Sequence, residues 1–185
     1  MKRLIYAALM LVMVAGAYSC GSSKKSKSPA GLIEDVAPLT GPKYRTDAEY
    51  FRAVQNGVSP EKSVAQKIAM QNCRQELAAN IQADMRIVIE NYLNVQKTSS
   101  RTSGEAQYQD LAYTVVKQKI VDVQVVEEKI YREESNGYYR YYVCLQLPKA
   151  SLEKAFEEAV AKNETLNLEF DRAEFKKIFD SMMAE

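Results

Sequence analysis

The longest regular pattern of apolar positions in the chain runs from Ser59 to about Gln96. Small and apolar residues recur there at steps of three and four, which turns one face of a helix toward a core: Val64, Ala65, Ile68, Ala69, Cys73, Leu77, Ile81, Met85, Val88 and Tyr92. Ser59 can cap this helix, and Pro60 suits its first position. A helix over residues 60–96 is about 55 Å long at 1.5 Å per residue. We therefore expect it to bend, to project beyond the sheet or to change state near Ala83.

Shorter patterns on both sides of this helix predict a sheet. Residues 49–55 are typical of a strand that ends at the turn-prone pair Asn56-Gly57. Valine alternates with polar residues over 121–125, which indicates a second strand. Asn136-Gly137 lies between two aromatic and β-branched runs, so it predicts a hairpin with a primed turn and a third strand over 138–147.

The third strand has two different faces. We assign its more apolar face to the core: Tyr139, Tyr141, Val143, Leu145 and Leu147. The opposite face carries aromatic and guanidinium groups of the kind enriched at interfaces. The candidate interaction face consists of Tyr138, Arg140, Tyr142 and Gln124. Two other interpretations stay open. The last helix folds over these side chains, or the tyrosines simply fill a sheet face that is partly exposed to solvent.

Three further helices complete the predicted fold. Thr102 and Glu105 have capping-box spacing and begin a second helix after a polar loop. A third helix follows Pro148, and a last one carries apolar residues from Phe175 to Met183. The order β-α-α-β-β-α-α predicts an α+β fold, with a small, largely antiparallel three-stranded sheet and helices packed on one face.

The first 19 residues have the features of an export signal. Lys2 and Arg3 precede an apolar run that is too short for a good membrane-spanning helix. Ala17-Tyr18-Ser19-Cys20 resembles a bacterial lipobox, which implies that Cys20 becomes the lipidated first residue of the mature protein. The alternative is an ordinary cleaved signal that happens to contain a cysteine. No aspartate follows Cys20, so the sorting rule of such lipoproteins implies the outer membrane, with the domain facing the periplasm or the cell surface.

Residues 20–45 are expected to form a tether, and residues 46–185 a single domain. The tether is rich in serine, lysine, glycine and proline, and a flexible coil of this length reaches roughly 25 Å. Its lysines Lys24, Lys25 and Lys27 either touch anionic lipid head groups or belong to a merely soluble spacer.

The composition excludes several classes of function. The 185 residues include 25 basic and 24 acidic side chains, a balance that argues against nucleic acid as a partner. The sequence has no histidine, which removes the commonest general base and the commonest transition-metal ligand. No cluster of residues has metal-ligand spacing, so we expect neither a metal nor a cofactor.

The remaining motifs give little support to an enzyme. Ser151 and Lys154 have the spacing found in penicillin-recognising serine enzymes, but the companion motifs are absent. The adjacent Glu127 and Glu128 face opposite ways on a strand, so we expect them to be solvated charges. We therefore expect a protein that is not an enzyme.

Two cysteines of the folded part leave a disulfide open. Cys73 and Cys144 could pair in an oxidising envelope, or remain two buried thiols. Cys144 lies on the strand face that we assign away from the helices, which argues against the bond.

Four segments within residues 48–160 together resemble the Lpp-twenty family of small bacterial outer-membrane lipoproteins and the related N-terminal domain of a flagellar assembly protein. They are Tyr50-Phe-Arg-Ala-Val-Gln-Asn-Gly57, the helical segment 65–78, the strand 121–128, and Tyr141-Tyr-Val-Cys-Leu-Gln-Leu-Pro148. In that family a strand ending in glycine precedes a helix of this type, and a strand-turn-strand pair follows. The resemblance implies envelope association and, in some members, assembly at the surface. It supplies no catalytic residue.

Two hypotheses about function follow from these observations. The first is a non-enzymatic envelope lipoprotein, held to the membrane through Cys20, that binds or assembles with another protein through the sheet face or the long helix. A homo-oligomer stays open. The alternative is a periplasmic carrier or sensor of a small apolar or cell-wall-derived ligand, held in a pocket between the helices and the sheet.

Overall fold

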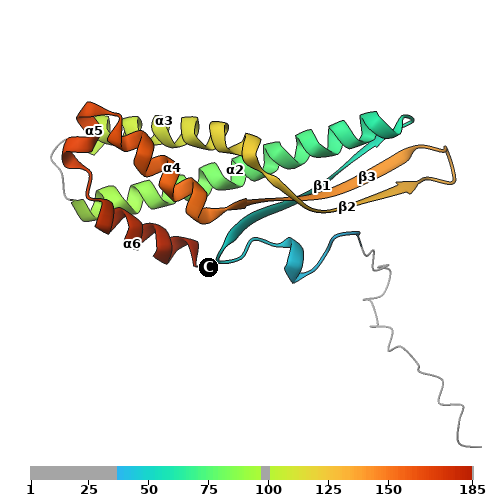
Figure 1. Cartoon of the computed structure of the whole chain (residues 1–185), viewed down its shortest axis with the longest axis horizontal. Helices are drawn as coiled ribbons and strands as arrows, with labels where there is room; N and C mark the ends of the chain where they lie inside the picture. The colour runs from blue at the N-terminus through green and yellow to red at the C-terminus, as the bar shows by residue number, and fades with distance from the viewer. Residues whose placement is uncertain (1–36, 97–100, 185) are drawn as a thin grey trace, which may run out of the picture. The chain divides into compact units, whose positions relative to one another are not determined.

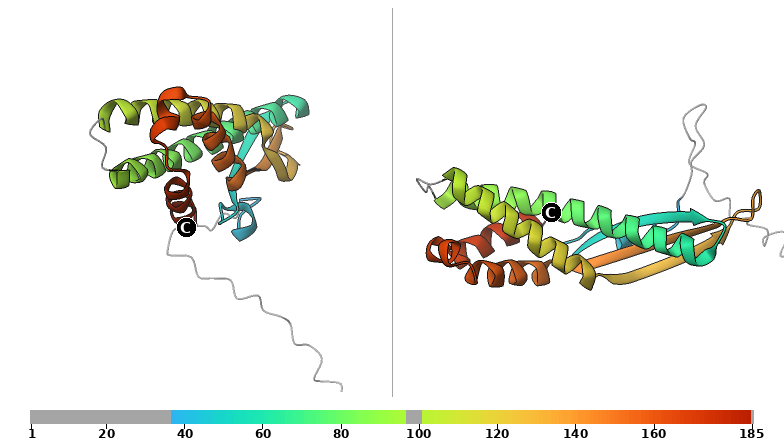
Figure 2. Two further views of the ribbon diagram at one scale, coloured as in Figure 1. Left: turned by 60° about the vertical axis from the view of Figure 1, so that its left-hand side comes forward. Right: turned by 90° about the horizontal axis from the view of Figure 1, so that it is seen from above.

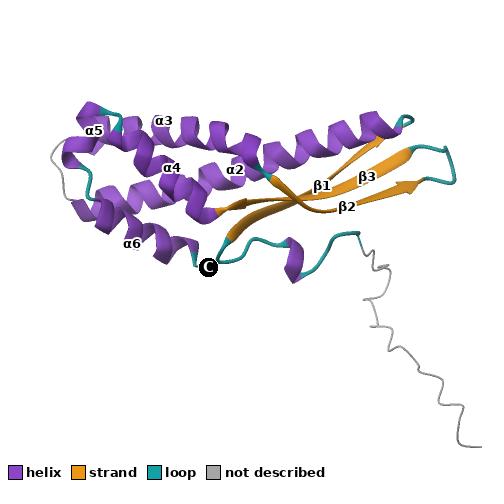
Figure 3. Ribbon diagram, in the orientation of Figure 1, coloured by secondary structure: helices purple, strands orange, loops and turns teal. Residues whose placement is uncertain are grey.

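A computed structural model describes residues 37–96 and 101–184. The predicted signal peptide, Cys20, the three tether lysines and most of the loop predicted after residue 96 lie outside the described residues. The elements follow the chain as η1 (Pro42–Tyr44), β1 (Tyr50–Ser59), α2 (Lys62–Gln96), α3 (Arg101–Lys119), η2 (Ile120–Asp122), β2 (Gln124–Arg132), β3 (Tyr139–Pro148), α4 (Lys149–Ala161), α5 (Glu164–Glu169) and α6 (Arg172–Met183). The α+β fold is confirmed (Figure 3).

The three strands form one antiparallel sheet in the order β1-β3-β2 (Figure 1). The predicted hairpin joins β2 to β3, but its primed turn is wrong: Glu133 N donates to Tyr138 O across a longer loop, and Gly137 has a positive φ of 74° whereas Asn136 does not. The apolar face assigned to β3 is correct, since Tyr141, Val143, Leu145 and Leu147 are buried and Tyr139 is half-buried. α2 covers this inner face of β1 and β3.

The long helix α2 is continuous and projects beyond the sheet. The end of α2 that follows β1 lies along the strands, and α3 and α6 pack on the part that extends past them (Figure 2). The size of the buried side chains of α2 changes between these two parts of the helix. The first buried residues of α2 are small (Ala65, Ala69, Cys73), and those after Leu77 are large (Ile81, Met85, Val88, Ile89, Tyr92, Leu93). Only α2 makes an extensive contact with the sheet, so the expected layer of several helices on one face is really a layer of one helix.

The prediction that the first strand ends at Asn56-Gly57 is wrong. β1 continues through both residues to Ser59 and stays paired with β3 along its whole length. Gly57 serves close packing instead of a turn. A Cβ atom at Gly57 would lie 2.4 Å from the backbone oxygen of Ala65 and 2.6 Å from the backbone nitrogen of Ala69. Only a glycine lets α2 approach β1 this closely.

The second strand begins later than its alternating valines suggest. Val121 lies in η2 with 72% of its surface exposed, and β2 starts at Gln124. A register shift between Val125 and Glu127 places a β-bulge in the strand. Beyond a bulge the alternation of faces is shifted by one residue, so the second half of β2 has the opposite phase to the first.

The folded unit begins before residue 46, where the tether was expected to end. We call residues 37–47 the strap. Leu39 has only 4% of its surface exposed, and Lys43 and Tyr44 both hydrogen-bond to Glu127 of β2. A segment with few apolar residues is held here by polar contacts, which its composition alone does not reveal.

The C-terminal helices form a second part of the core around the far end of α2. The prediction gives one break between the last two helices, and the structure places the short α5 in it. Asn163 caps α5 by accepting hydrogen bonds from the backbone of Thr165 and Leu166. An aromatic cluster fills the space between the helices: Tyr92, Tyr108, Phe156, Phe170, Phe175 and Phe179. α6 packs on α2, so the interpretation that the last helix covers the candidate interaction face is wrong.

We predict that Gly57→Ala destabilises the fold by about 1–3 kcal/mol or more, because the new methyl group overlaps backbone atoms of α2. The matched control is Gly104→Ala in α3, where a Cβ meets nothing within 4 Å. That change should stabilise the helix by roughly 0.5–1 kcal/mol. Urea unfolding of the two variants measures both effects, and equal midpoints would contradict the close packing at Gly57.

Candidate interaction face

The outer face of the sheet, which points away from α2, is built from four rows of side chains that cross the strands. The rows follow from the pairing of β1, β3 and β2: Arg52, Gln146 and Gln124; Val54, Cys144 and Glu127; Asn56, Tyr142 and Lys129; Val58, Arg140 and Tyr131. The strap crosses the first two rows and leaves the last two rows open.

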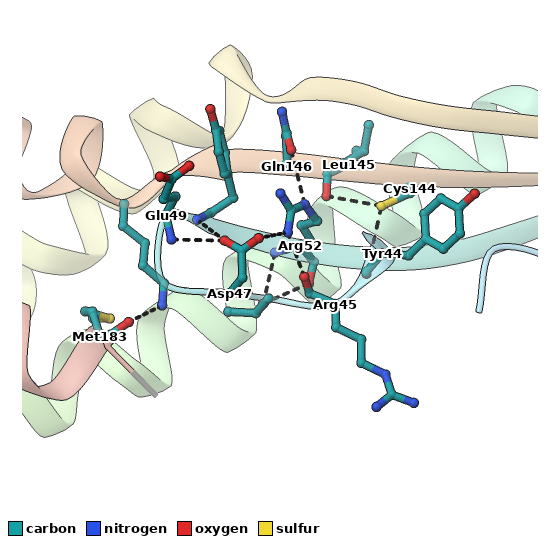
Figure 4. Close-up of polar contacts among 12 residues, drawn as sticks. Tyr44, Arg45, Asp47, Glu49, Arg52, Cys144, Leu145, Gln146 and Met183 are labelled. Atoms are coloured by element: carbon teal, nitrogen blue, oxygen red, sulfur yellow. Dashed lines mark hydrogen bonds and ion pairs between the residues drawn. The ribbon is translucent and has the colours of Figure 1, made fainter. Parts of the chain in front are cut away.

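At one end the strap is held by a shared carboxylate. Lys43 Nζ and Tyr44 Oη both donate to Glu127 Oε2, at 2.8 and 2.7 Å. The Cys144 thiol lies beneath, with its Sγ 4.0 Å from the backbone oxygen of Tyr44 and none of its surface exposed (Figure 4). The strap therefore closes the Cys144 thiol from solvent, whereas Glu127 and Val54 in the same row are half-buried.

At the other end the strap is held by Arg52 (Figure 4). Its guanidinium forms an ion pair with Asp47, donates to the backbone oxygen of Arg45 at 2.9 Å, and reaches Gln146 Oε1 at 3.2 Å. Asp47 also accepts hydrogen bonds from the backbone of Glu49 and Tyr50, which fixes the turn into β1. One arginine thus joins the strap to two strands.

These contacts lower the pKa of the two carboxylates that hold the strap, Glu127 of β2 and Asp47 of the strap itself. Hydrogen bonds from Lys43 and then Tyr44 lower the pKa of Glu127 to about 2 from its usual 4.5. The hydrogen bond from Arg52 lowers the pKa of Asp47 to about 2 from 3.8. Both groups are therefore ionised at neutral pH.

The last two rows and Tyr138 form what we call the open face. Tyr131 and Tyr142 meet edge to face there, with their ring centroids 5.9 Å apart and their planes at 84°. Tyr131 and Tyr138 have 47% and 40% of their surfaces exposed. In residues 37–96 and 101–184, no helix packs against this face (Figure 2). Large aromatic side chains are therefore presented to solvent on a sheet.

The arginine of the open face is held in place. Arg140 Nε and Nη2 both donate to Glu133 Oε1, at 3.0 and 2.6 Å, and Nη1 lies 3.4 Å from Asn56 Oδ1. Hydrogen bonds from Asn136 and then Arg140 lower the pKa of Glu133, while the hydrogen bond to Glu133 raises the pKa of Arg140. A fixed guanidinium loses less freedom when it binds a partner.

The structure brings together three of the four predicted residues. Tyr138, Arg140 and Tyr142 share the open face, whereas Gln124 lies in the first row, which the strap crosses, and accepts from Gln146 Nε2 at 3.3 Å. Gln124 is thus on the predicted face of the sheet, but the prediction that it lies beside the other three residues is wrong.

Sequence reasoning missed Tyr131 and Lys129. The bulge after Val125 brings them onto the outer face, since an uninterrupted alternation from Gln124 puts the odd-numbered residues on the inner face. The adjacent valines Val125 and Val126, which break the alternation, are the signal that could have found them.

The disulfide left open between Cys73 and Cys144 is not formed, and both are free thiols. Cys73 lies on α2 and donates to the backbone oxygen of Ala53 at 3.1 Å, whereas Cys144 faces the strap on the other side of the sheet. Burial raises the pKa of Cys73 to about 12 and also raises the pKa of Cys144. The sheet separates the two thiols.

The adjacent glutamates do face opposite ways, but neither is merely solvated. Glu127 holds the strap on the outer face. Glu128, on the other side, accepts a hydrogen bond from the Tyr141 hydroxyl, which itself accepts from Gln66 Nε2 at 3.2 Å. Burial and then the bond to Glu128 raise the pKa of Tyr141 to about 12.

A groove of about 750 Å³ lies between α3 and α4, away from the sheet. Its apolar residues are Leu111, Val115, Ala155 and Ala159, and its polar ones are Thr114, Gln118, Lys119, Asp122, Ser151, Lys154, Glu158 and Lys162. The Ser151 hydroxyl donates to the backbone oxygen of Pro148 at 2.8 Å, and Lys154 Nζ lies 3.9 Å from Glu158. The serine and lysine of the S-x-x-K spacing are thus each engaged elsewhere.

One buried charge has a structural role. Lys149 at the start of α4 donates to the backbone oxygen of Met183, at the end of α6, and lies 5.2 Å from the centre of the Phe51 ring. Burial lowers the pKa of this lysine. The ammonium group satisfies a helix-end carbonyl that has no partner within its own helix.

Two further observations concern the described part of the chain alone. No three side chains of the histidine, cysteine, aspartate or glutamate type gather there in a way that could hold a metal ion. None of its helices combines the length and apolar character that crossing a membrane requires.

No family model matches the sequence, and no curated protein matches it. The resemblance to the Lpp-twenty lipoproteins stays a prediction.

We predict that Glu127→Gln releases the strap and exposes the Cys144 thiol, because the neutral amide loses the ion pair with Lys43. The labelling rate of Cys144 by a maleimide at neutral pH should rise several-fold, as measured by mass spectrometry of peptides. Cys73 is an internal control under α2, and Glu134→Gln, on an exposed side chain, is the matched variant. Unchanged labelling of Cys144 would contradict the role of Glu127.

We also predict that the strap contributes to stability above about pH 4.5 and that this contribution is lost as the pH falls toward 2. Glu127 and Asp47 have lower pKa values folded than unfolded, so the unfolded state takes up protons first. Urea unfolding at pH 5 and pH 3 should show a smaller loss of stability in Glu127→Gln than in the unmodified chain. Equal losses would show that Glu127 does not carry this dependence.

Proposed function

We propose that this chain is a non-enzymatic lipoprotein of the outer membrane, anchored through Cys20, that binds a protein partner through the open face. The observation that carries the proposal is the exposed Tyr131, in edge-to-face contact with the half-buried Tyr142, beside the fixed Arg140. Tyrosine and arginine are the residue types that most often dominate binding energy at protein interfaces.

The surroundings of the open face also favour a binding role. It lies on a sheet in which β1 and β3 are packed against α2 on their other side, so Arg140 and Tyr142 of β3 are held before a partner arrives. The backbone between Arg132 and Tyr138 is closed by a hydrogen bond from Glu133 N to Tyr138 O of 2.8 Å. A partner therefore meets a surface that needs little reorganisation.

The lipobox-like segment supports the anchor and the location. Its cysteine precedes a short polar stretch, after which the strap leads directly onto the outer face of the sheet. The anchor and the rows that the strap covers are thus joined by about 20 residues of chain, between Cys20 and Lys43. This arrangement favours partners that lie at the membrane surface.

The groove between α3 and α4 favours a second candidate, a carrier of a small amphipathic ligand. Its volume falls within the range of small-molecule sites, and its lining combines apolar side chains with charged ones, three of them lysines. It lies between helices, not between helices and sheet as the sequence suggested. Native mass spectrometry of the protein released gently from membranes would detect a bound ligand, and Ala155→Trp should remove it by filling the floor.

For the interaction proposal, a photo-crosslinking phenylalanine analogue placed at Tyr138 should capture a specific protein in intact cells. Tyr131→Ala with Tyr142→Ala should weaken this capture by at least about tenfold, since interface tyrosines are often worth 1–2 kcal/mol each. Mass spectrometry identifies the captured chain.

The matched control is Tyr113→Ala, which removes an exposed tyrosine from α3, a helix that packs on α2 and α4. It should leave the crosslink unchanged. A crosslink that survives the double variant, or one that Tyr113→Ala abolishes equally, would remove the open face from consideration.

A further inference from the structure

The outer edge of β2 is unpaired. The sheet order β1-β3-β2 leaves β2 with β3 as its single partner strand within residues 37–96 and 101–184 (Figure 1). Such an edge presents a row of free backbone N–H and C=O groups that can pair with another strand. The stretch from Glu128 to Arg132 also lies beyond Glu127, where the strap is bound, so the strap leaves it free.

The hydrogen bonds between β2 and β3 identify which residues of β2 direct their backbone N–H and C=O groups to the free edge. In an antiparallel ladder, alternate residues direct both backbone groups to the neighbouring strand, and those between direct them away. Glu133 N donates to Tyr138 O at 2.8 Å, so the odd-numbered residues before it face β3. Glu128, Ile130 and Arg132 therefore direct their backbone groups outward.

The side chains of these three residues complement those of a second β2 that runs antiparallel to the first. Ile130, with 37% of its surface exposed, lies between an acidic and a basic side chain on the same face of the sheet. A two-fold axis through Ile130 would set Glu128 of each chain opposite Arg132 of the other. It would also set Lys129 of each chain opposite Tyr131 of the other, a cation–π arrangement.

We propose that a second copy of this chain adds its β2 to this edge, antiparallel and centred on Ile130, so that two three-stranded sheets become one six-stranded sheet. A closed two-fold pairing requires a surface that complements itself, and the sequence of β2 meets this requirement. Two isoleucines meet at the axis, with an ion pair on either side.

The neighbouring registers are unfavourable. An axis through Glu128 opposes two glutamates, and an axis through Lys129 opposes two lysines; like charges directly opposite each other destabilise a sheet. An axis through Tyr131 opposes Ile130 to Arg132. Charges on an edge strand often serve to block pairing, but on β2 their order selects one register of self-pairing.

This inference does not rest on the proposed function, because the pairing is made by the backbone edge of β2 and by Glu128, Ile130 and Arg132, whose side chains lie on the opposite side of the sheet from the open face. Of the open face it involves Lys129 and Tyr131 alone. The partner bound by the open face can be lost while the pairing of β2 remains, and the reverse also holds. The variants below leave Tyr142 and Arg140 unchanged.

The test is charge reversal with complementation, on the full chain purified in mild detergent. Glu128→Arg alone places arginine opposite arginine at both ion pairs, and Arg132→Glu alone places glutamate opposite glutamate. Each variant should be monomeric where the unmodified chain is dimeric, with dimer affinity weakened roughly tenfold or more. Mixing the two variants restores both ion pairs, so a one-to-one heterodimer should form, as measured by native mass spectrometry.

Two controls keep the result interpretable. Glu134→Arg changes an exposed charge beside the edge and should leave the dimer intact. Because Glu128 accepts from Tyr141 and Arg132 donates to Gly137 O, circular dichroism and urea unfolding must show that both variants fold. Ile130→Pro removes an N–H that the monomer does not use and should also give a monomer.

The proposal is overturned if the unmodified chain is monomeric throughout the measured concentration range. It is equally overturned if the single reversals remain dimeric, or if the mixture of folded variants does not form the heterodimer.

Discussion

The close approach of α2 to β1 at Gly57 is the constraint on which the rest of the structure depends. The backbone of Ala65 and Ala69 occupies the place where any other side chain at Gly57 would lie. This contact sets the height of the helix above the sheet, and with it the depth available for Cys73 and for the apolar face of β3. Because α2 is one uninterrupted helix, its position over the sheet also fixes where its far end meets the aromatic cluster.

The outer face of the same sheet is organised by charge instead of by apolar packing. Two carboxylates, on Asp47 and Glu127, hold the strap, and Arg52 joins it to the strands. Surface ion pairs contribute little on average, but here they act together with hydrogen bonds and with the buried Leu39. The result is a face divided into a covered half, where Cys144 is enclosed, and an open half, where the tyrosines stand.

The sequence predicts most of the elements because their patterns are long and local. The spacing of apolar residues from Val64 to Tyr92 is enough for α2, and Asn136-Gly137 is enough for the hairpin. Gly57 misleads for a physical reason, since a glycine that permits a turn and a glycine that permits close packing look the same in a sequence. The bulge after Val125 moves Tyr131 to the open face through one extra residue, and the strap depends on partners over 80 positions away. Long-range contacts of this kind leave no periodic signal.

The continuity of α2 has a consequence for how the two parts of the core unfold. The sheet and the C-terminal helices both pack on α2. Neither part can therefore open fully without exposing apolar surface of a helix on which the other part also packs. Local openings of the two regions are therefore thermodynamically linked, and a change among the aromatic rings near Tyr92 alters how often the strands around Ala53 are exposed. In this protein, distance along the helix does not insulate one region from the other.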